Sequence, residues 1–159
     1  MPTRLGLIGD TQGRYDVAGL LNRVTRAFEG VDEVWHAGDW LYPEVLDGLG
    51  RIAPLTVVNG NAPDDPRYPI RVSRQFGGLT VGMIHVLPRP GDPWLDGLDI
   101  CIHGHSHRWR DEVVGGVRLV NVSTPTAAGF SRDRTAGILS IEHDSATLQR
   151  VEFPIEAAG

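Results

Sequence analysis

The first third of the chain alternates short apolar runs with amphipathic stretches. Apolar runs that end in polar turns predict buried strands at residues 5–9, 33–36 and 55–58. Between them, apolar positions at helical spacing predict helices over 17–28, capped by Asp16, and over 43–49, opened by Pro43. This alternation is typical of a parallel-centred α/β core.

The rest of the chain is dominated by paired strands. Two Gly-Gly turns predict hairpins, which join residues 70–76 to 79–86 and 112–114 to 117–120. Between the hairpins we expect a proline-rich loop with at most one helical turn, over 94–98, and then a buried strand, 98–102. A last pair is predicted at 135–141 and 146–153. We expect this part to be mostly antiparallel, in an α/β fold of two sheets packed face to face with helices outside.

Composition narrows the function classes. At 159 residues the chain is expected to form one domain, residues 1–159. The net charge of −5 gives no basic footprint, so a nucleic-acid partner is not expected. All fifteen basic residues are Arg, which excludes lysine Schiff-base chemistry, and the single Cys101 is predicted to be a buried hydrophobe. No run is long enough to cross a bilayer and residues 1–4 lead directly into a predicted strand without a long apolar segment, so we expect a cytoplasmic protein without a membrane partner.

Polar side chains follow the predicted strands. The set is Asp10, Gln12, Asp39, Asn61, His85, His105 and His107. The carboxyl ends of parallel strands are where α/β proteins bind ligands, and histidines at alternating positions past a strand end are well placed to converge on a metal.

The order of these residues resembles the calcineurin-like metallophosphoesterase superfamily, and most closely its small single-domain phosphodiesterase branch. That family's blocks read D-x-H, G-D, G-N, a lone His and G-H-x-H. Here they stand as Asp10-Thr11-Gln12, Gly38-Asp39, Gly60-Asn61, His85 and Gly104-His105-Ser106-His107. Each block alone is a weak signal, but five in the right order are a strong one.

The resemblance implies a four-layer α/β/β/α sandwich, with two mixed sheets flanked by helices, and a centre of two divalent metal ions. Asp39 would bridge the ions, Asp10, Gln12 and His107 would complete site one, and Asn61, His85 and His105 would complete site two. Two carboxylates against two divalent ions leave the pocket positive, which suits a phosphate ester that a metal-bound hydroxide attacks in line. We assign Asp39, Asn61 and His105 as catalytic, and Arg14 and Asn61 as substrate-binding.

Gln12 stands where the family pattern has His. An amide oxygen is a neutral, harder ligand than imidazole, so a site one that includes it would favour Mn or Mg over Zn or Ni. Mn is therefore the first candidate, with Mg, Fe, Ni, Co and Zn as alternatives. The competing interpretation is that Gln12 does not bind a metal and that site one is weak or empty. His36 and His103 lie within or at the ends of strands and are expected to support the site rather than to bind metal.

Other departures concern the substrate. Only twenty positions separate His85 from His105, which leaves little room for the helix that these proteins commonly carry there. Arg132 and Arg134 join Arg14 as candidates for phosphate contact, although a solvated surface role is the simpler interpretation of each. Tryptophans border the motif loops at Trp40, Trp94 and Trp109, where ordinary packing is the simpler interpretation than stacking on a base.

Two functions follow from these patterns. The first is a metal-dependent phosphodiesterase or phosphatase that acts on a small phosphate ester, which includes nucleotides among the candidates. The alternative is a catalytically weakened protein-interaction scaffold, by analogy with the retromer subunit built on this fold. A nuclease is disfavoured because the chain offers no basic groove. The sequence leaves the natural substrate, the choice between monoester and diester, and homo-oligomer formation open.

Overall fold

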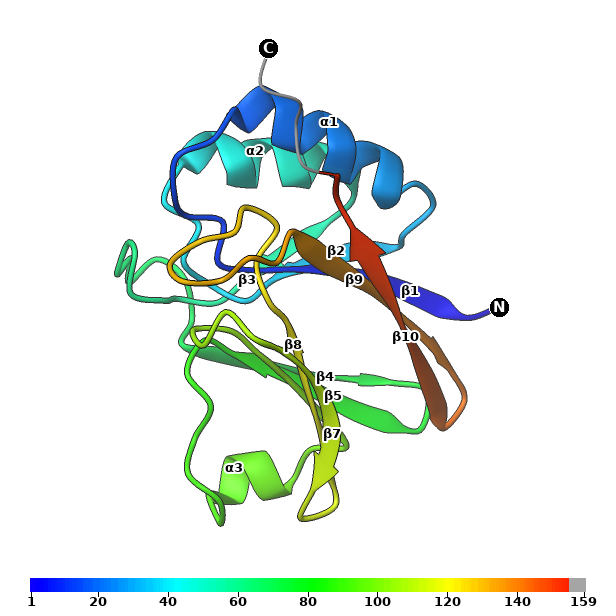
Figure 1. Ribbon diagram of the computed structural model, residues 1–159. Coiled ribbons are helices and arrows are strands. Elements are labelled where there is room, and N and C mark those ends of the chain that lie inside the picture. The colour runs from blue at the N-terminus through cyan, green and yellow to red at the C-terminus, as the bar shows by residue number, and fades with distance from the viewer. Residues whose placement is uncertain (155–159) are drawn as a thin grey trace.

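The computed structural model describes residues 1–154 as two five-stranded sheets packed face to face (Figure 1). The first sheet has the order β10-β9-β1-β2-β3. Its strands are β1 (Thr3–Ile8), β2 (Glu33–His36), β3 (Leu55–Val57), β9 (Thr135–Glu142) and β10 (Ser145–Glu152). The predicted parallel core is confirmed, since β1, β2 and β3 pair in parallel, and β9 then adds to the free side of β1 in the antiparallel direction.

The second sheet has the order β4-β5-β6-β8-β7. Its strands are β4 (Arg71–Phe76), β5 (Leu79–Ile84), β6 (Ile100–His103), β7 (Trp109–Val114) and β8 (Val117–Val122). Both predicted hairpins are present, β4 with β5 and β7 with β8. The prediction of a mostly antiparallel second part is confirmed by these hairpins and by β9 with β10, and β6 is the exception, because it pairs in parallel with both β5 and β8. The loop between β5 and β6 provides the long crossover that a parallel pair requires.

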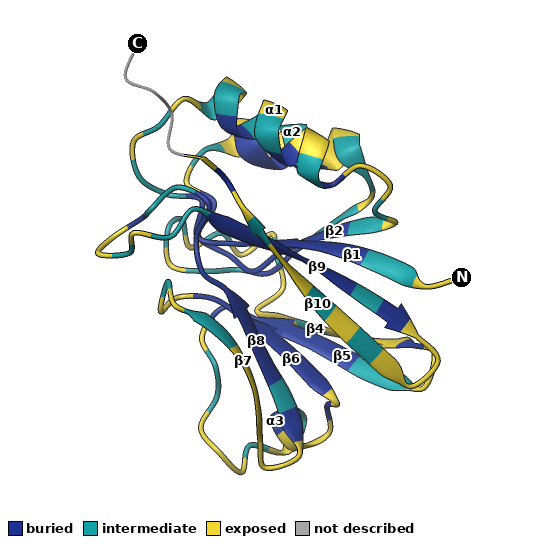
Figure 2. Ribbon diagram, turned by 45° about the vertical axis from the view of Figure 1, so that its right-hand side comes forward, coloured by how far each residue is buried: buried dark blue, intermediate teal, exposed yellow. Residues whose placement is uncertain are grey.

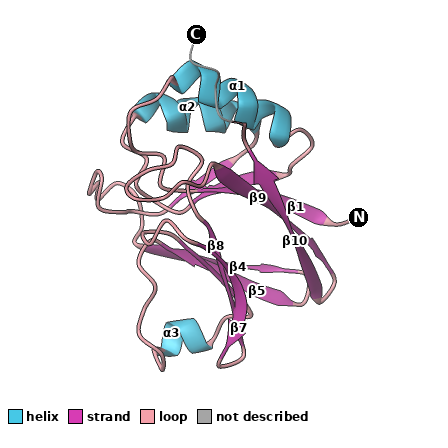
Figure 3. Cartoon of the chain, in the orientation of Figure 1, coloured by secondary structure: helices cyan, strands magenta, loops and turns pink. Residues whose placement is uncertain are grey.

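Helices cover the outer faces of both sheets (Figure 3). The helices α1 (Val17–Ala27) and α2 (Pro43–Ile52) lie on the first sheet, and α3 (Pro93–Asp96) lies outside the second. The four-layer sandwich is therefore confirmed, with a fourth layer of one short helix, as the spacing of the histidines predicts. Within residues 1–154, no helix is long and apolar enough to cross a membrane.

Helix capping agrees with the prediction in position. Asp16 is the N-cap residue of α1, although its side chain makes no capping hydrogen bond. Asp92 caps α3 instead, where its carboxylate accepts the backbone N–H of Trp94 at 2.9 Å. Pro43 occupies the first turn of α2 as predicted.

Two apolar layers hold the sandwich together (Figure 2). The layer between the sheets contains Leu5, Leu7, Trp35 and Met83, all fully buried. The layer under α1 includes the Phe28 ring, which packs so closely on β1 that a Cβ at Gly6 would lie 2.7 Å from it. Alternate residues of β1 thus face opposite layers, as expected of a strand covered on both faces. Cys101 is a free, buried thiol whose pKa burial raises to about 12, which confirms the prediction of a buried hydrophobe.

The topology brings distant loops to one edge of the sandwich. Because β1, β2 and β3 are parallel, the loops that follow them leave the first sheet at the same edge. The loops after β5 and β6 leave the second sheet in the same way. The polar residues singled out in the sequence occupy these loops. The predicted domain extends to residue 159, and its last five residues lie outside the described part.

Candidate metal centre

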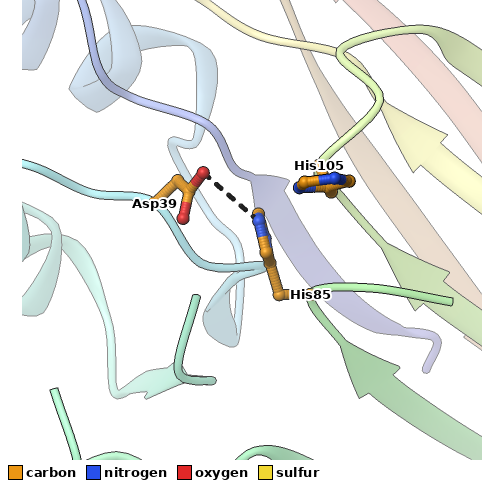
Figure 4. A group of neighbouring side chains, drawn as sticks. All are labelled: Asp39, His85 and His105. Carbon is orange, nitrogen blue, oxygen red and sulfur yellow. Dashed lines mark ion pairs between the residues drawn. The ribbon is translucent and has the colours of Figure 1, made fainter. Parts of the chain in front are cut away.

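Two clusters of ligand-type side chains meet where the loops converge. One consists of Asp39, His85 and His105, and the other of Asp10, Asp39 and His107. Within each cluster, the candidate ligand atoms all lie within 4.8 Å of one another. Figure 4 shows Asp39 and His105 on either side of His85. Asp39 belongs to both clusters, which is the arrangement expected of a carboxylate shared by two cations.

The Asp39 carboxylate is held by its backbone surroundings. One oxygen, Oδ1, accepts the backbone N–H groups of Asn61 and, at 2.9 Å, of Ala62. The other oxygen, Oδ2, lies 3.2 Å from His85 Nε2. Burial alone would raise the pKa of Asp39, but the hydrogen bonds from His85 and from the backbone outweigh burial, and the pKa lies well below its usual range. Asp39 is therefore an anion at neutral pH, with Oδ2 left to bind a cation.

His85 and His107 present the nitrogen that a metal needs. Nδ1 of His85 lies 2.8 Å from the carbonyl oxygen of Ala37, and Nδ1 of His107 lies 3.0 Å from that of Ala128. Because a carbonyl oxygen only accepts, each Nδ1 carries the hydrogen and each neutral ring keeps a lone pair on Nε2. Apart from Oδ2 of Asp39 at 3.2 Å, buried Nε2 of His85 has no polar partner among the described residues. Nε2 of His85 thus faces the shared Asp39, and Nε2 of His107 lies 3.3 Å from Oδ1 of Asp10.

His105 and Asn61 form the exposed side of the centre. Nδ1 of His105 lies 3.1 Å from Oδ1 of Asn61, and the His105 ring stands edge-on to His85 with centroids 5.3 Å apart. The backbone N–H of His105 donates to Asp10 Oδ2 at 3.1 Å. This bond ties the loop after β6 to the loop after β1, so it joins the two clusters across the sheets.

The loop that carries Asp10 and Gln12 is fixed by hydroxyl groups that the sequence did not reveal. Four consecutive carbonyl oxygens of this loop each accept a side-chain hydroxyl. The pairs are Thr124 to Asp10 at 2.8 Å, Tyr15 to Thr11 at 2.6 Å, Thr126 to Gln12 at 2.7 Å and Tyr42 to Gly13 at 2.7 Å. The donors come from three separate segments, so only the Thr-x-Thr spacing of the late loop hinted at them. Together they position the backbone under both candidate ligands.

The Gln12 side chain reaches the centre with its amide nitrogen foremost. Nε2 donates to Asp39 Oδ2 at 3.3 Å and lies 3.4 Å from His107 Nε2, while the buried Oε1 has no partner in the described part of the chain. A half-turn of the terminal amide exchanges the two atoms. Oε1 would then face the Asp39 carboxylate and the His107 lone pair, an arrangement that only a cation between them would stabilise. The donor set of carboxylates, imidazoles and amide oxygens fits divalent cations in this position.

Backbone strain marks the same residues. Asp10, Asp39, His105 and His107 have φ angles of 51°, 60°, 73° and 55°, in the left-handed region that disfavours side chains. Such strain is concentrated at functional sites, where the surrounding structure compensates for it. The glycine of the G-N block has a steric role, because a Cβ at Gly60 would overlap the Asp39 carboxylate.

Two further histidines lie beneath the centre, at the strand ends where the sequence predicts them. His36 is fully buried at the end of β2, where Nδ1 accepts the backbone N–H of Gly38 at 3.0 Å and Nε2 pairs with the hydroxyl of Thr11. Burial, followed by the charge of His85, lowers the pKa of His36 to about 3. His103 ends β6, and burial lowers its pKa to about 4. Both are neutral and belong to neither cluster.

A hollow of about 680 Å³ opens beside the centre. His105 and His107 line it, together with Arg132, which the sequence singled out, and Arg108 and Arg150, which it did not. The arginine predicted to bind substrate, Arg14, is exposed and is not among the described residues that line the hollow.

Of the remaining candidates for substrate contact, only Trp109 borders this hollow. Arg134 lines a smaller depression. Of the three tryptophans that border the motif loops, Trp40 is buried, Trp94 packs against the guanidinium of Arg71, and Trp109 borders the hollow.

Comparisons with known proteins agree with this geometry. Residues 3–144 match the family model of the calcineurin-like phosphoesterase superfamily domain. A probable metallophosphoesterase of Methanothermobacter thermautotrophicus is 31% identical over 150 residues, which cover 87% of this chain and 86% of that protein.

Solved structures show the same fold. Vps29 of Entamoeba histolytica superposes with a TM-score of 0.75 at 22% identity, over 96% of this chain and all of that one. A structure described as a novel archaeal phosphodiesterase gives a TM-score of 0.73 at 22% identity, over 94% of this chain and all of that one.

Proposed function

This chain belongs to the calcineurin-like phosphoesterase superfamily, and we propose that it hydrolyses a small phosphate ester at a centre of two divalent metal ions. The observation that carries the proposal is the sharing of Asp39 by two ligand clusters. The fold resembles both a phosphodiesterase and Vps29 at 22% identity, so the fold likeness alone does not separate hydrolysis from other roles.

The residues divide between the two ions as the clusters do. Asp39 would contact both ions. Asp10, His107 and the amide oxygen of Gln12 would hold one, and His85, His105 and Asn61 the other. When bound, the ions would polarise the phosphoryl oxygens and lower the pKa of water, which makes it a nucleophile at neutral pH.

The protein's own groups prepare this chemistry. The carbonyl contacts at Nδ1 orient His85 and His107 and leave Nε2 of each neutral ring free of hydrogen, so that Nε2 can bind a cation, and the two carboxylates are the only anions of the ligand set. Two divalent cations then leave the centre with a net positive charge that attracts a phosphate ester. Asn61 and His105 are the exposed members, so they are the ligands that substrate contacts first. Gln12 makes the first site rich in oxygen, which favours Mn.

We further propose that the protein acts in the cytoplasm on small molecules. The net charge of −5 argues against nucleic acid as a partner, because a nucleic-acid backbone is bound by an extended basic surface. The composition gives no reason to expect a membrane partner.

The test is hydrolysis of bis(p-nitrophenyl) phosphate and p-nitrophenyl phosphate by metal-free protein reloaded with Mn, Mg, Co or Ni. We expect Mn-dependent turnover that falls at least about a hundredfold in Asp39→Asn, because both ions lose their shared ligand. Asp47→Asn, which removes an exposed carboxylate from α2, is the matched control and should retain activity. Inactivity with all four metals, or full activity of Asp39→Asn, would refute the proposal.

A scaffold without turnover is the competing function. It is favoured by the orientation of Gln12, whose amide nitrogen donates a hydrogen bond to the Asp39 oxygen to which a cation would otherwise bind. This alternative predicts metal-independent folding and no hydrolysis under any of the conditions above. Turnover in proportion to bound Mn would exclude it.

A further inference from the structure

The hollow beside the candidate metal centre is lined by positively charged side chains that are not among the candidate metal ligands. One part of its wall is the loop with His105 and His107, and another part carries Arg108, Arg132 and Arg150. Arg108 follows His107 directly in the chain, so the basic wall adjoins the candidate ligands. A ligand bound at the centre would therefore extend into a basic space.

Two of the three arginines are uncompensated. Arg150 lies 3.7 Å from Asp133 and donates to Glu152 at 3.1 Å, so its charge is neutralised. Arg108 and Arg132 are exposed and form no ion pair or hydrogen bond with any residue from 1 to 154. Asp133 is the only carboxylate among the described lining residues, and Arg150 already occupies it.

Among the described residues, Arg108 and Arg132 differ from the arginines elsewhere on the surface in lying unpaired beside the candidate metal ligands. Arg67, Arg74 and Arg118 are paired with carboxylates on the surface. Arg26 is exposed without an ion pair among the described residues, but it lies on α1, away from the hollow. Only Arg108 and Arg132 place free guanidinium groups in one hollow with candidate metal ligands, within the described part of the chain.

We propose that this hollow binds a second phosphate group of the substrate, so that the substrate class is phosphate esters that carry another phosphate. This inference rests on the proposed function for the identity of the reacting group. Guanidinium groups present several donors in a fork that matches phosphate oxygens, and the charge-assisted bonds are strong. The volume of about 680 Å³ exceeds the needs of a lone phosphate and accommodates an organic group between the two phosphates. Trp109 and the exposed ring of Phe130 supply apolar surface for that group.

The first experiment tests the hollow without the metal centre. Inorganic tripolyphosphate is titrated calorimetrically into metal-free full-length protein at low ionic strength. Without cations the centre presents the carboxylates of Asp10 and Asp39, which repel the anion, so binding reports the arginines. We expect affinity to fall at least about tenfold in the double variant Arg108→Gln/Arg132→Gln. Arg26→Gln is the matched control and should bind like the parent protein.

The second experiment tests the substrate class. The Mn-loaded protein is given thymidine 5′-(p-nitrophenyl phosphate) and its 3′-phosphorylated counterpart, which differ only in the second phosphate. We expect the phosphorylated ester to have a kcat/KM at least about tenfold higher, and the ratio to approach one in the double variant. The ratio should persist in Arg26→Gln.

The two experiments distinguish failure of the anion site from failure of the substrate class and from failure of the proposed function. Tripolyphosphate affinity that is absent, or equal in the parent and the double variant, overturns the anion site whether or not the protein is an enzyme. Hydrolysis without preference for the second phosphate overturns the substrate class and leaves the proposed function intact. Arginine-dependent tripolyphosphate binding without hydrolysis of either ester supports the anion site and counts against the proposed function. Because Arg108 and Arg132 are exposed, the variants are expected to fold, and a thermal melt verifies this.

Discussion

Gln12 is the residue that would decide the character of the first site in the proposed metal centre. Its amide oxygen is buried without a partner in the described structure, while its nitrogen faces Asp39 and His107. A cation would reverse this orientation, because the oxygen then gains a ligand bond that the nitrogen cannot make.

Exchange of Gln12 for histidine should therefore change metal preference. In Gln12→His, imidazole replaces a harder oxygen ligand, so we expect Zn affinity to rise at least about tenfold relative to Mn affinity. Competition titrations with a chromogenic chelator measure both. Gln149→His, an exposed exchange on β10, is the matched control. An unchanged Zn-to-Mn ratio in Gln12→His would mean that Gln12 is not a ligand.

His36 links the protonation state of the interior to stability. Its Nδ1 accepts the N–H of Gly38, so protonation would place two donors face to face. The folded pKa of about 3 lies below the ordinary value of 6.5, so the unfolded chain takes up the proton first as the pH falls. The His36 contribution to stability is thus complete above pH 6.5 and is lost as the pH falls below that value.

This difference predicts the pH profile of a variant. Between about pH 6 and about pH 4, metal-free parent protein should lose about 1.4 kcal/mol per pH unit more than His36→Asn, which has no titrating group there. Urea unfolding across this range measures the difference. The comparison removes the opposite effect of His85 and His107, whose raised pKa values favour the fold in acid. Parallel profiles would show that His36 is protonated in the fold.

At the scale of elements, the loop after β1 owes its shape to the hydroxyls that its carbonyls accept. The donors Thr124 and Thr126 come from the loop after β8, while Tyr15 precedes α1 and Tyr42 precedes α2. The loop is thus held from the first layer of helices and from the second sheet at the same time. This arrangement explains why Asp10 keeps a strained φ of 51°.

Loss of single hydroxyls should weaken metal binding. Thr126→Val and Tyr42→Phe each remove one hydroxyl-to-carbonyl bond, so we expect Mn affinity to fall about tenfold and stability to fall by about 1 kcal/mol. Thr25→Val removes the same kind of bond, from Thr25 Oγ1 to the carbonyl of Leu21, at 2.7 Å within α1. This control should lower stability without changing Mn affinity. Equal Mn affinities in all three variants would contradict a positioning role for the loop.

At the scale of the whole molecule, local patterns predicted the elements, and their order was sufficient for the fold class. The three parallel strands of the first sheet follow from short apolar runs that end in polar turns, and both hairpins follow from Gly-Gly turns. The parallel pairing of β6 could not be read locally, because neither β5 nor β8 adjoins β6 in the chain. The strand lies between them because its two apolar faces are both buried.

The candidate site divides in the same way. Asp10, Asp39 and the motif histidines can be predicted from the sequence, because they lie near the ends of predicted strands and in blocks that resemble those of a known family. The basic hollow can be predicted only in part, since the sequence indicates Arg132 as a candidate for phosphate contact but not Arg108 or Arg150. Arg108 directly follows the histidine loop and Arg150 lies on β10, and only the packing of the sheets brings the two together. Residues that come together only through tertiary packing cannot be identified from a local sequence pattern.

The proposed metal centre depends on two cations that share Asp39. The most direct test is the Mn content per chain, measured by elemental analysis after reconstitution and removal of free metal. We expect two Mn ions per chain in the parent protein and a loss of both in Asp39→Asn, with Asp47→Asn unchanged. One ion per chain would leave Gln12 outside the ligand set, and a parent protein that retains no Mn would contradict a metal centre at this edge of the sandwich.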